Sequence, residues 1–228
     1  MPRIAVYAGH GGSDPGAVSN GIYEKDITLA LSNATTSILR AAGYEVINNR
    51  TTDVNRNLNA DIALANRSNV AGVVEIHMNS NLGSPGSGTE AYYSVSGGRG
   101  RTLAQALVNS LTALGFRDRG IKTRVNASGQ DYFGIIRETN APSSLLEVAF
   151  INNPHDMSLL NINRVSQAIA NAIMQTFPLT TTPTVPPSGG NPIIRNIQST
   201  LNQRYGTNLA ADGIFGRLTK TALVKGLQ

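Results

Sequence analysis

The sequence predicts an α/β protein with a mixed, mostly parallel twisted sheet, helices on both faces, and a small helical module at the carboxyl end. Short apolar runs alternate with segments of helical periodicity over most of the chain, which is typical of a largely parallel sheet covered on both sides. A stretch of Pro, Thr, Ser and Gly then interrupts this pattern, and two helical patterns follow it.

Individual elements are predicted from the spacing of apolar residues. The run from Ile4 to His10 indicates a buried strand. Glu24 opens a segment with apolar residues at helical spacing, and Gly43 ends it. The same criteria predict strands at 44–47, 73–77, 88–95 and 144–150, and helices at 58–71, 101–114, 156–176, 192–205 and 217–227.

The domain organisation is predicted from one change in composition. Residues 178–192 read PLTTTPTVPPSGGNP, which contains almost nothing that a core could bury and is typical of an extended linker. This linker separates a catalytic domain expected at 1–177 from a small helical module expected at 193–228.

Composition excludes several classes of protein. The chain has no cysteine, which excludes disulfides, thiolate catalysis and cysteine-ligated zinc. No run reaches the roughly 18 apolar residues of a membrane helix, so no membrane span is expected. The chain passes from Met1 directly into a strand pattern, so no signal peptide is visible.

The positive charge is concentrated near the carboxyl end. The net charge of the chain is +5, and beyond residue 177 only Asp212 is acidic. The basic residues in this part are Arg195, Arg204, Arg217, Lys220 and Lys225. This imbalance indicates an anionic partner surface, with a simple solvated basic face as the alternative.

Two of the three histidines lie where strands give way to loops. His10 and His77 each end an apolar run and precede small or polar residues, and this edge of an open α/β sheet is where ligands bind. Glu24, at a helix start, is either a carboxylate favoured by the helix terminus or a third ligand. Two histidines and one carboxylate form a zinc set that leaves a position for water. His155, at another helix start, is interpreted as structural or solvent-facing.

Three further charged residues are candidates for the site. Glu147 lies inside an apolar strand pattern, where burial raises the pKa of a carboxyl and makes it a better general base near neutral pH. Glu75 precedes His77 by two residues and so shares its strand face, as a supporting partner or a rival base. Arg137 is a cationic candidate for holding a substrate carboxylate or a developing oxyanion.

Several motifs occur together in an order found in one known family. The motifs are 9–12 (GHGG), 14–17 (DPGA), 24–26 (EKD), 50–53 (RTTD), 76–79 (IHMN), 88–93 (GTEAYY) and 142–160 (PSSLLEVAFINNPHDMSLL). Over essentially all of 1–177, the chain resembles zinc-dependent N-acetylmuramoyl-L-alanine amidases of the amidase-3 type. One departure is Glu75, since members of this family often have serine there.

The resemblance implies a fold, an activity and a set of site residues. It implies a six-stranded sheet with helices on both faces, one zinc ion held by His10, Glu24 and His77, and Glu147 as the catalytic carboxylate. The implied reaction is hydrolysis, by zinc-activated water, of the amide between the N-acetylmuramic acid lactyl group and L-alanine of the stem peptide. Two alternatives are a wall-binding protein without catalysis and a zinc hydrolase acting on another amide.

The last part of the chain resembles a short helical peptidoglycan-binding module. Residues 212–216, Thr219, Ala222 and 227–228 carry this likeness. The expected partners are bacterial peptidoglycan and its muropeptides, together with anionic wall polymers, and no nucleic acid. We expect the protein to act at the bacterial cell wall, as an endolysin released by lysis or as an autolysin secreted with a signal that is later removed.

Overall fold

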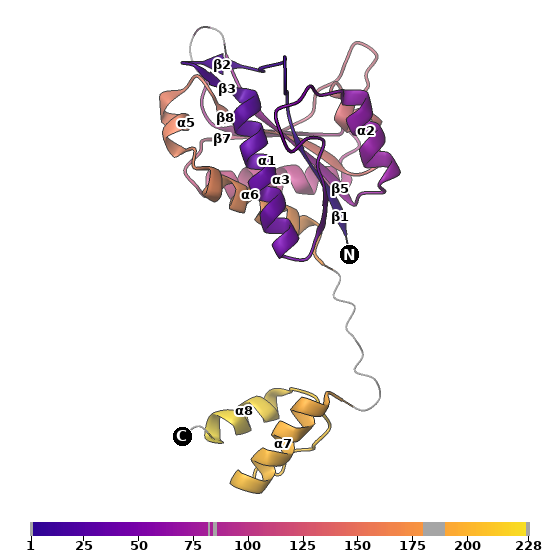
Figure 1. The fold of residues 1–228 in the computed structure, drawn as a ribbon, viewed down its shortest axis with the longest axis vertical. Coiled ribbons are helices and arrows are strands. Elements are labelled where there is room, and N and C mark those ends of the chain that lie inside the picture. Colours follow the sequence, from indigo (N-terminus) through magenta and orange to yellow (C-terminus); the bar gives the residue numbers. More distant parts are fainter. Residues whose placement is uncertain (1, 82, 84–85, 180–189, 227–228) are drawn as a thin grey trace. The chain divides into compact units, whose positions relative to one another are not determined.

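The computed structural model describes residues 2–81, 83, 86–179 and 190–226 and contains two compact units (Figure 1). The first spans Met1–Thr180 and the second spans Thr181–Gln228. Most of the expected linker at 178–192 lies outside the described residues, so the exact boundaries of the domains stay predictions. Among the described helices, none is long and apolar enough to cross a membrane.

A six-stranded sheet forms the centre of the first unit. Its strands in spatial order are β4 (Glu45–Ile47), β1 (Arg3–Ala8), β5 (Gly72–Asn79), β8 (Ser143–Phe150), β6 (Thr89–Tyr93) and β7 (Asp118–Lys122). All neighbouring pairs are parallel except β6 and β8, which are antiparallel. The predicted mixed, mostly parallel sheet is confirmed.

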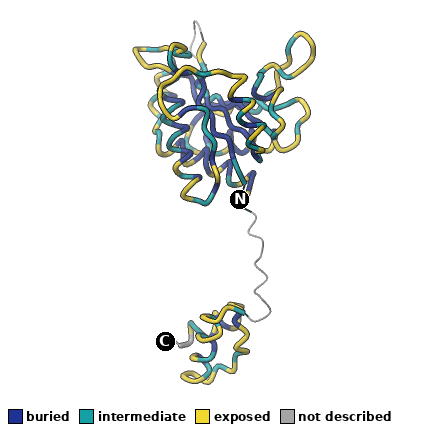
Figure 2. The backbone as a smooth tube through the Cα atoms, turned by 45° about the vertical axis from the view of Figure 1, so that its right-hand side comes forward, coloured by how far each residue is buried: buried dark blue, intermediate teal, exposed yellow. Residues whose placement is uncertain are grey.

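Helices cover both faces of this sheet, because its buried strands present apolar side chains alternately to either side. One face packs against α1 (Glu24–Ala41), α3 (Gly98–Thr112) and α6 (Ile162–Thr176). The opposite face packs against α2 (Leu58–Arg67) and α4 (Gly134–Glu138). The buried residues therefore concentrate in the middle of the unit, along the central strands (Figure 2).

The pairing of the central strands places one imidazole and two carboxyl side chains in a single row across the sheet. His77 on β5 lies opposite Glu147 on β8, and Glu147 lies opposite Glu90 on β6. Directly paired residues point to the same face of a sheet, here the face that α2 and α4 cover. The carboxyl ends of parallel β1 and β5 meet at one edge, so His10, just beyond β1, lies beside this row.

Several elements differ from the sequence prediction. The helix expected at 156–176 is two helices, α5 (Pro154–Leu159) and α6, because Leu160 is extended and Asn161 caps α6 by accepting a hydrogen bond from the Arg164 amide. Strand β7, helix α4 and the hairpin of β2 (Val18–Ser19) and β3 (Ile22–Tyr23) were not predicted. These elements are short and lack an apolar run.

The second unit pairs helix α7 (Pro192–Tyr205) with helix α8 (Arg217–Gly226). The buried side chain of Gln198 connects α7 to the turn between the helices. Its Nε2 donates to Asp212 Oδ1 at 2.8 Å and to the Ile214 carbonyl at 3.0 Å, and its Oε1 accepts from the Gly213 amide at 2.8 Å. One buried side-chain amide therefore holds the turn between the two helices.

Candidate metal centre and catalytic site

His10 lies in the loop that follows β1, with its backbone in the left-handed region at φ 59°. Histidine tolerates this conformation better than most side chains, whereas β-branched residues are genuine outliers there. The buried guanidinium of Arg50 holds the loop, donating to the Gly9 carbonyl at 3.1 Å and the Lys25 carbonyl at 2.7 Å. Arg50 therefore ties the backbone just before His10 to the first turn of α1.

His77 lies near the end of β5, packed against the backbone of Gly9. A Cβ atom at Gly9 would overlap the imidazole ring of His77, so only glycine leaves room for that ring. Burial lowers the pKa of His77, but hydrogen bonding to Glu24 and the charge of Glu75 outweigh burial and raise that pKa to about 10 in the metal-free protein.

Glu24 begins helix α1 directly after the β2–β3 hairpin, and its carboxylate is buried. Oε1 accepts hydrogen bonds from the Met78 amide at 2.8 Å and lies 3.0 Å from His77 Nδ1, while Oε2 accepts from the Ala17 amide at 2.8 Å. Burial raises the pKa of Glu24, but hydrogen bonds to His10 and His77 hold it well below its usual range. Glu24 is therefore held as a charged carboxylate.

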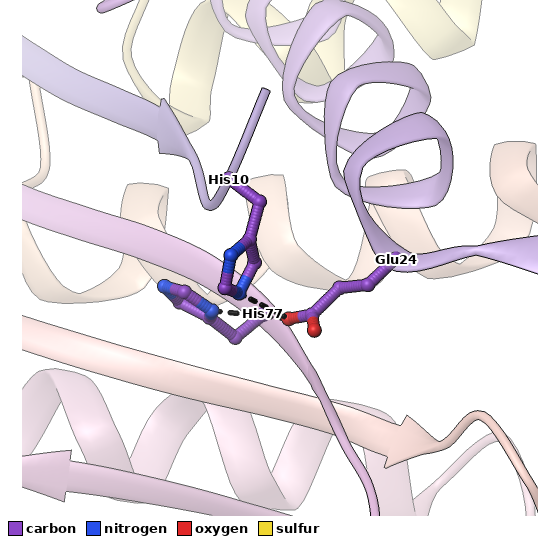
Figure 3. A group of neighbouring side chains, drawn as sticks. All are labelled: His10, Glu24 and His77. Atoms are coloured by element: carbon purple, nitrogen blue, oxygen red, sulfur yellow. Dashed lines mark hydrogen bonds and ion pairs between the residues drawn. The ribbon is translucent and has the colours of Figure 1, made fainter. Parts of the chain in front are cut away.

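The structure brings His10, Glu24 and His77 together as a group that could hold a metal ion, with one ligand atom from each within 4.8 Å of the others (Figure 3). Glu24 Oε1 faces His10 Nε2 at 3.3 Å as well as His77 Nδ1. The remaining nitrogen of each ring faces a second carboxylate, since His10 Nδ1 lies 2.8 Å from Asp14 and His77 Nε2 lies 3.8 Å from Glu75.

Glu147 lies next to this group on β8, opposite His77. Its Oε2 is shielded from solvent and has no hydrogen-bond partner among the residues that the structure describes. Burial raises the pKa of Glu147 to about 7; the charge of His77 opposes this rise, and the charges of Glu24 and Glu90 add to it. Such a carboxyl can take up and release a proton near neutral pH.

Arg137, the cationic candidate, lies on α4. Its guanidinium donates to the carbonyls of Asp131 and Tyr132 and to the carboxylate of Glu138. It also lines a cavity of about 390 Å³ together with Ser143, at the amino end of β8. The structure gives no contact between Arg137 and the described residues of the metal group or Glu147, so its role in the reaction stays a prediction.

Apart from Glu75, two groups of charged residues beside the site were not predicted from the sequence. Glu90, buried opposite Glu147, accepts from Arg119 Nε at 2.5 Å and from Lys122 Nζ at 2.6 Å. On the other side, Arg56 pairs with both Glu75 and Asp61. Glu90 could have been identified as a glutamate inside a short strand. No local sequence pattern identifies Arg56.

The family model for N-acetylmuramoyl-L-alanine amidases matches residues 4–177. The chain belongs to this family. The amidase is 36% identical over 174 residues to the uncharacterized protein YqiI of Bacillus subtilis, covering 75% of this chain and 81% of that protein. It is 34% identical over 187 residues to the sporulation-specific N-acetylmuramoyl-L-alanine amidase of the same species, covering 78% of this chain and 69% of the relative.

Solved structures agree with these relationships. The catalytic domain of CwlV, an N-acetylmuramoyl-L-alanine amidase from Bacillus (Paenibacillus) polymyxa var. colistinus, superimposes with a TM-score of 0.69 at 34% identity, covering 78% of this chain and 98% of that domain. Family, fold class and enzyme class are thus as predicted: the chain is a peptidoglycan amidase that acts at the cell wall. The family match stops at residue 177 and leaves the second unit outside it.

The contact between Gly9 and His77 predicts the effect of one methyl group. The Gly9→Ala substitution should displace the His77 ring and weaken Zn²⁺ binding by at least about tenfold, because ligand geometry is lost. Equilibrium dialysis against Zn²⁺ measures the affinity. Gly216→Ala is the matched control, since a Cβ there meets no atom within 4 Å. Equal affinities in both variants would contradict the packing role of Gly9.

Proposed function

We propose that this amidase cleaves the bond between the lactyl group of N-acetylmuramic acid and L-alanine of the stem peptide, with one zinc ion held by His10, Glu24 and His77. The proposal rests mainly on the unpartnered Oε2 of Glu147 beside a group of converging ligand atoms. A metal site that was only structural would have no need of a carboxylate with a shielded, unpartnered oxygen next to it.

The residues present fit a zinc ion. Two imidazole nitrogens and one carboxylate oxygen are a donor set that zinc uses in catalytic sites, where a fourth position stays open. The atoms that face one another are His10 Nε2, His77 Nδ1 and Glu24 Oε1. A zinc ion held there would supply Lewis-acid chemistry, polarising an amide carbonyl and lowering the pKa of water.

Glu147 carries out the proton transfer of the reaction. Glu147 takes a proton from the water molecule that attacks the carbonyl carbon of the lactyl amide. The C–N bond breaks, and Glu147 returns the proton to the nitrogen of L-alanine, so the products are a lactyl carboxylate and a stem peptide with a free amine. A pKa of about 7 suits both halves of this proton transfer.

The second unit is proposed to bind the cell wall. Its exposed basic side chains include Arg195, Arg204 and Lys220, and they complement an anionic wall polymer. Exposed apolar side chains of the same unit, Ile193 and Leu218 among them, offer contacts for a neutral glycan. Tethering such a unit to the amidase raises the local concentration of enzyme on its insoluble substrate. Release by lysis and secretion are both consistent with this role.

The bond that is cleaved can be read from the products. Mass spectrometry of peptidoglycan digested by the wild-type protein should find stem peptides with a new free L-alanine amino terminus. Glu147→Gln should produce none while binding zinc as the wild type does, because the amide cannot accept the proton. New reducing sugar ends, or peptide release by the variant at a near wild-type rate, would contradict the proposal.

The pH dependence follows from the need for an ionised Glu147. The ionised fraction is complete above the pKa of Glu147, about 7, and is lost as the pH falls through it, so kcat/KM should fall on the acid side. A bound dication lowers this pKa, which places the midpoint at or below about pH 7. Hydrolysis of a soluble muropeptide at saturating zinc gives the profile, with circular dichroism as the check on folding. A flat profile down to about pH 5 would rule out Glu147 as the base.

Removal of the second unit tests its role in binding. A chain ending at residue 180 keeps the family-matched region, so it should bind zinc and cleave soluble muropeptides normally. Its binding to insoluble cell walls should be weaker and should depend less on salt, because exposed basic groups are lost. Cosedimentation with purified walls at low and high salt measures both effects. Unchanged cosedimentation would assign wall binding to the amidase unit itself.

A further inference from the structure

Glu75 is a buried glutamate on β5 that the reaction does not use. It lies two residues before His77 and on the same face of the strand, and 2% of its surface is exposed. Its Oε1 is 3.8 Å from His77 Nε2. Because His77 Nδ1 faces Glu24, the nitrogen turned toward Glu75 is the one that does not point at the metal ligands.

The carboxylate of Glu75 is in turn held by a chain of charged groups. The guanidinium of Arg56 pairs with Glu75 through Nη2 and donates from Nε to Asp61 Oδ2 at 2.6 Å. Asp61 is buried in the first turn of α2 and also accepts from Asn49 Nδ2 at 3.1 Å. Asn49 exchanges hydrogen bonds with the amide and carbonyl of Ala8, two residues before His10.

We infer that Glu75 is a positioning residue for the metal ligand His77, and that Arg56 and Asp61 hold Glu75 in place for this role. The inference rests on the proposed metal site. A carboxylate facing the second nitrogen of a ligating histidine favours the proton on that nitrogen, orients the ring and strengthens the ligand. Glu75, 3.8 Å away, would act on His77 through its charge and not through a direct hydrogen bond. Arg56 prevents Glu75 from turning away, and the Asp61–Asn49 link joins this support to the strand that leads to His10.

The alternative is that the three charged groups only stabilise the fold. A buried ion pair is weak evidence for stability, since well-packed apolar residues often replace one without loss. The two roles therefore predict different zinc affinities when the Arg56–Glu75 pair is replaced by apolar side chains. A stabilising pair can be exchanged for apolar side chains with metal binding intact, whereas a positioning carboxylate cannot.

The test compares zinc affinity in four full-length proteins by competition with a chromophoric chelator. Glu75→Gln keeps the size of the side chain and removes its charge, and should weaken zinc binding by about 10- to 100-fold. The double variant Arg56→Met with Glu75→Leu removes the ion pair together and should bind zinc as weakly as Glu75→Gln. Glu45→Gln is the matched control, because Glu45 also pairs with an arginine, Arg3, but at an exposed surface.

Two further measurements separate the outcomes. Thermal unfolding of the metal-free proteins shows whether each variant is folded, and the visible spectrum of the cobalt-substituted proteins should change in Glu75→Gln but not in Glu45→Gln. Wild-type zinc affinity in a folded Glu75→Gln or in the folded double variant would overturn the role of Glu75. Failure of the wild-type protein to bind zinc would instead overturn the metal site itself.

Discussion

The buried carboxylate of Glu24 is the interaction on which the site depends. Glu24 lies in the first turn of α1. Its carboxylate accepts hydrogen bonds from the Met78 amide of β5 and from the Ala17 amide in the loop after β1. One side chain thus joins a strand, a loop and a helix that are separate in sequence. Both histidines face the same oxygen of that carboxylate, so the proposed ligand group and the local fold are held by the same contacts.

The sheet supplies the rest of the site by register. The register of β8 places Glu147 opposite His77 on β5 and opposite Glu90 on β6. The three side chains therefore form a single row across three strands. Charged groups this close together interact strongly. Glu90 pairs with two cations, Arg119 and Lys122, whereas Glu147 has no cation in direct contact among the described residues. The same strand pairing therefore produces one carboxyl, Glu90, whose pKa is lowered by its cations and one, Glu147, whose pKa is raised to about 7 by burial.

Much of this arrangement could be predicted from the sequence, and the remainder could not for identifiable reasons. Apolar runs ending in His10 and His77 marked the central strands, and a glutamate inside another run marked Glu147. Strand β7 escaped prediction because DRGIK is charged and contains a glycine with positive φ. Arg56 escaped because its importance depends on a long-range contact with Glu75, which no local pattern encodes.

The left-handed backbone at His10, a proposed zinc ligand, restricts which metal-binding residues evolution or design can place there. Asparagine, aspartate and histidine adopt this conformation most readily among residues with side chains, and of these only aspartate and histidine are common metal ligands. Cysteine has no such preference, which disfavours a thiolate at this position. An exchange to aspartate would turn a two-imidazole set toward hard oxygen donors, which suit manganese and magnesium better than zinc. Backbone geometry at one loop residue thus limits the metal selectivity available to the whole site.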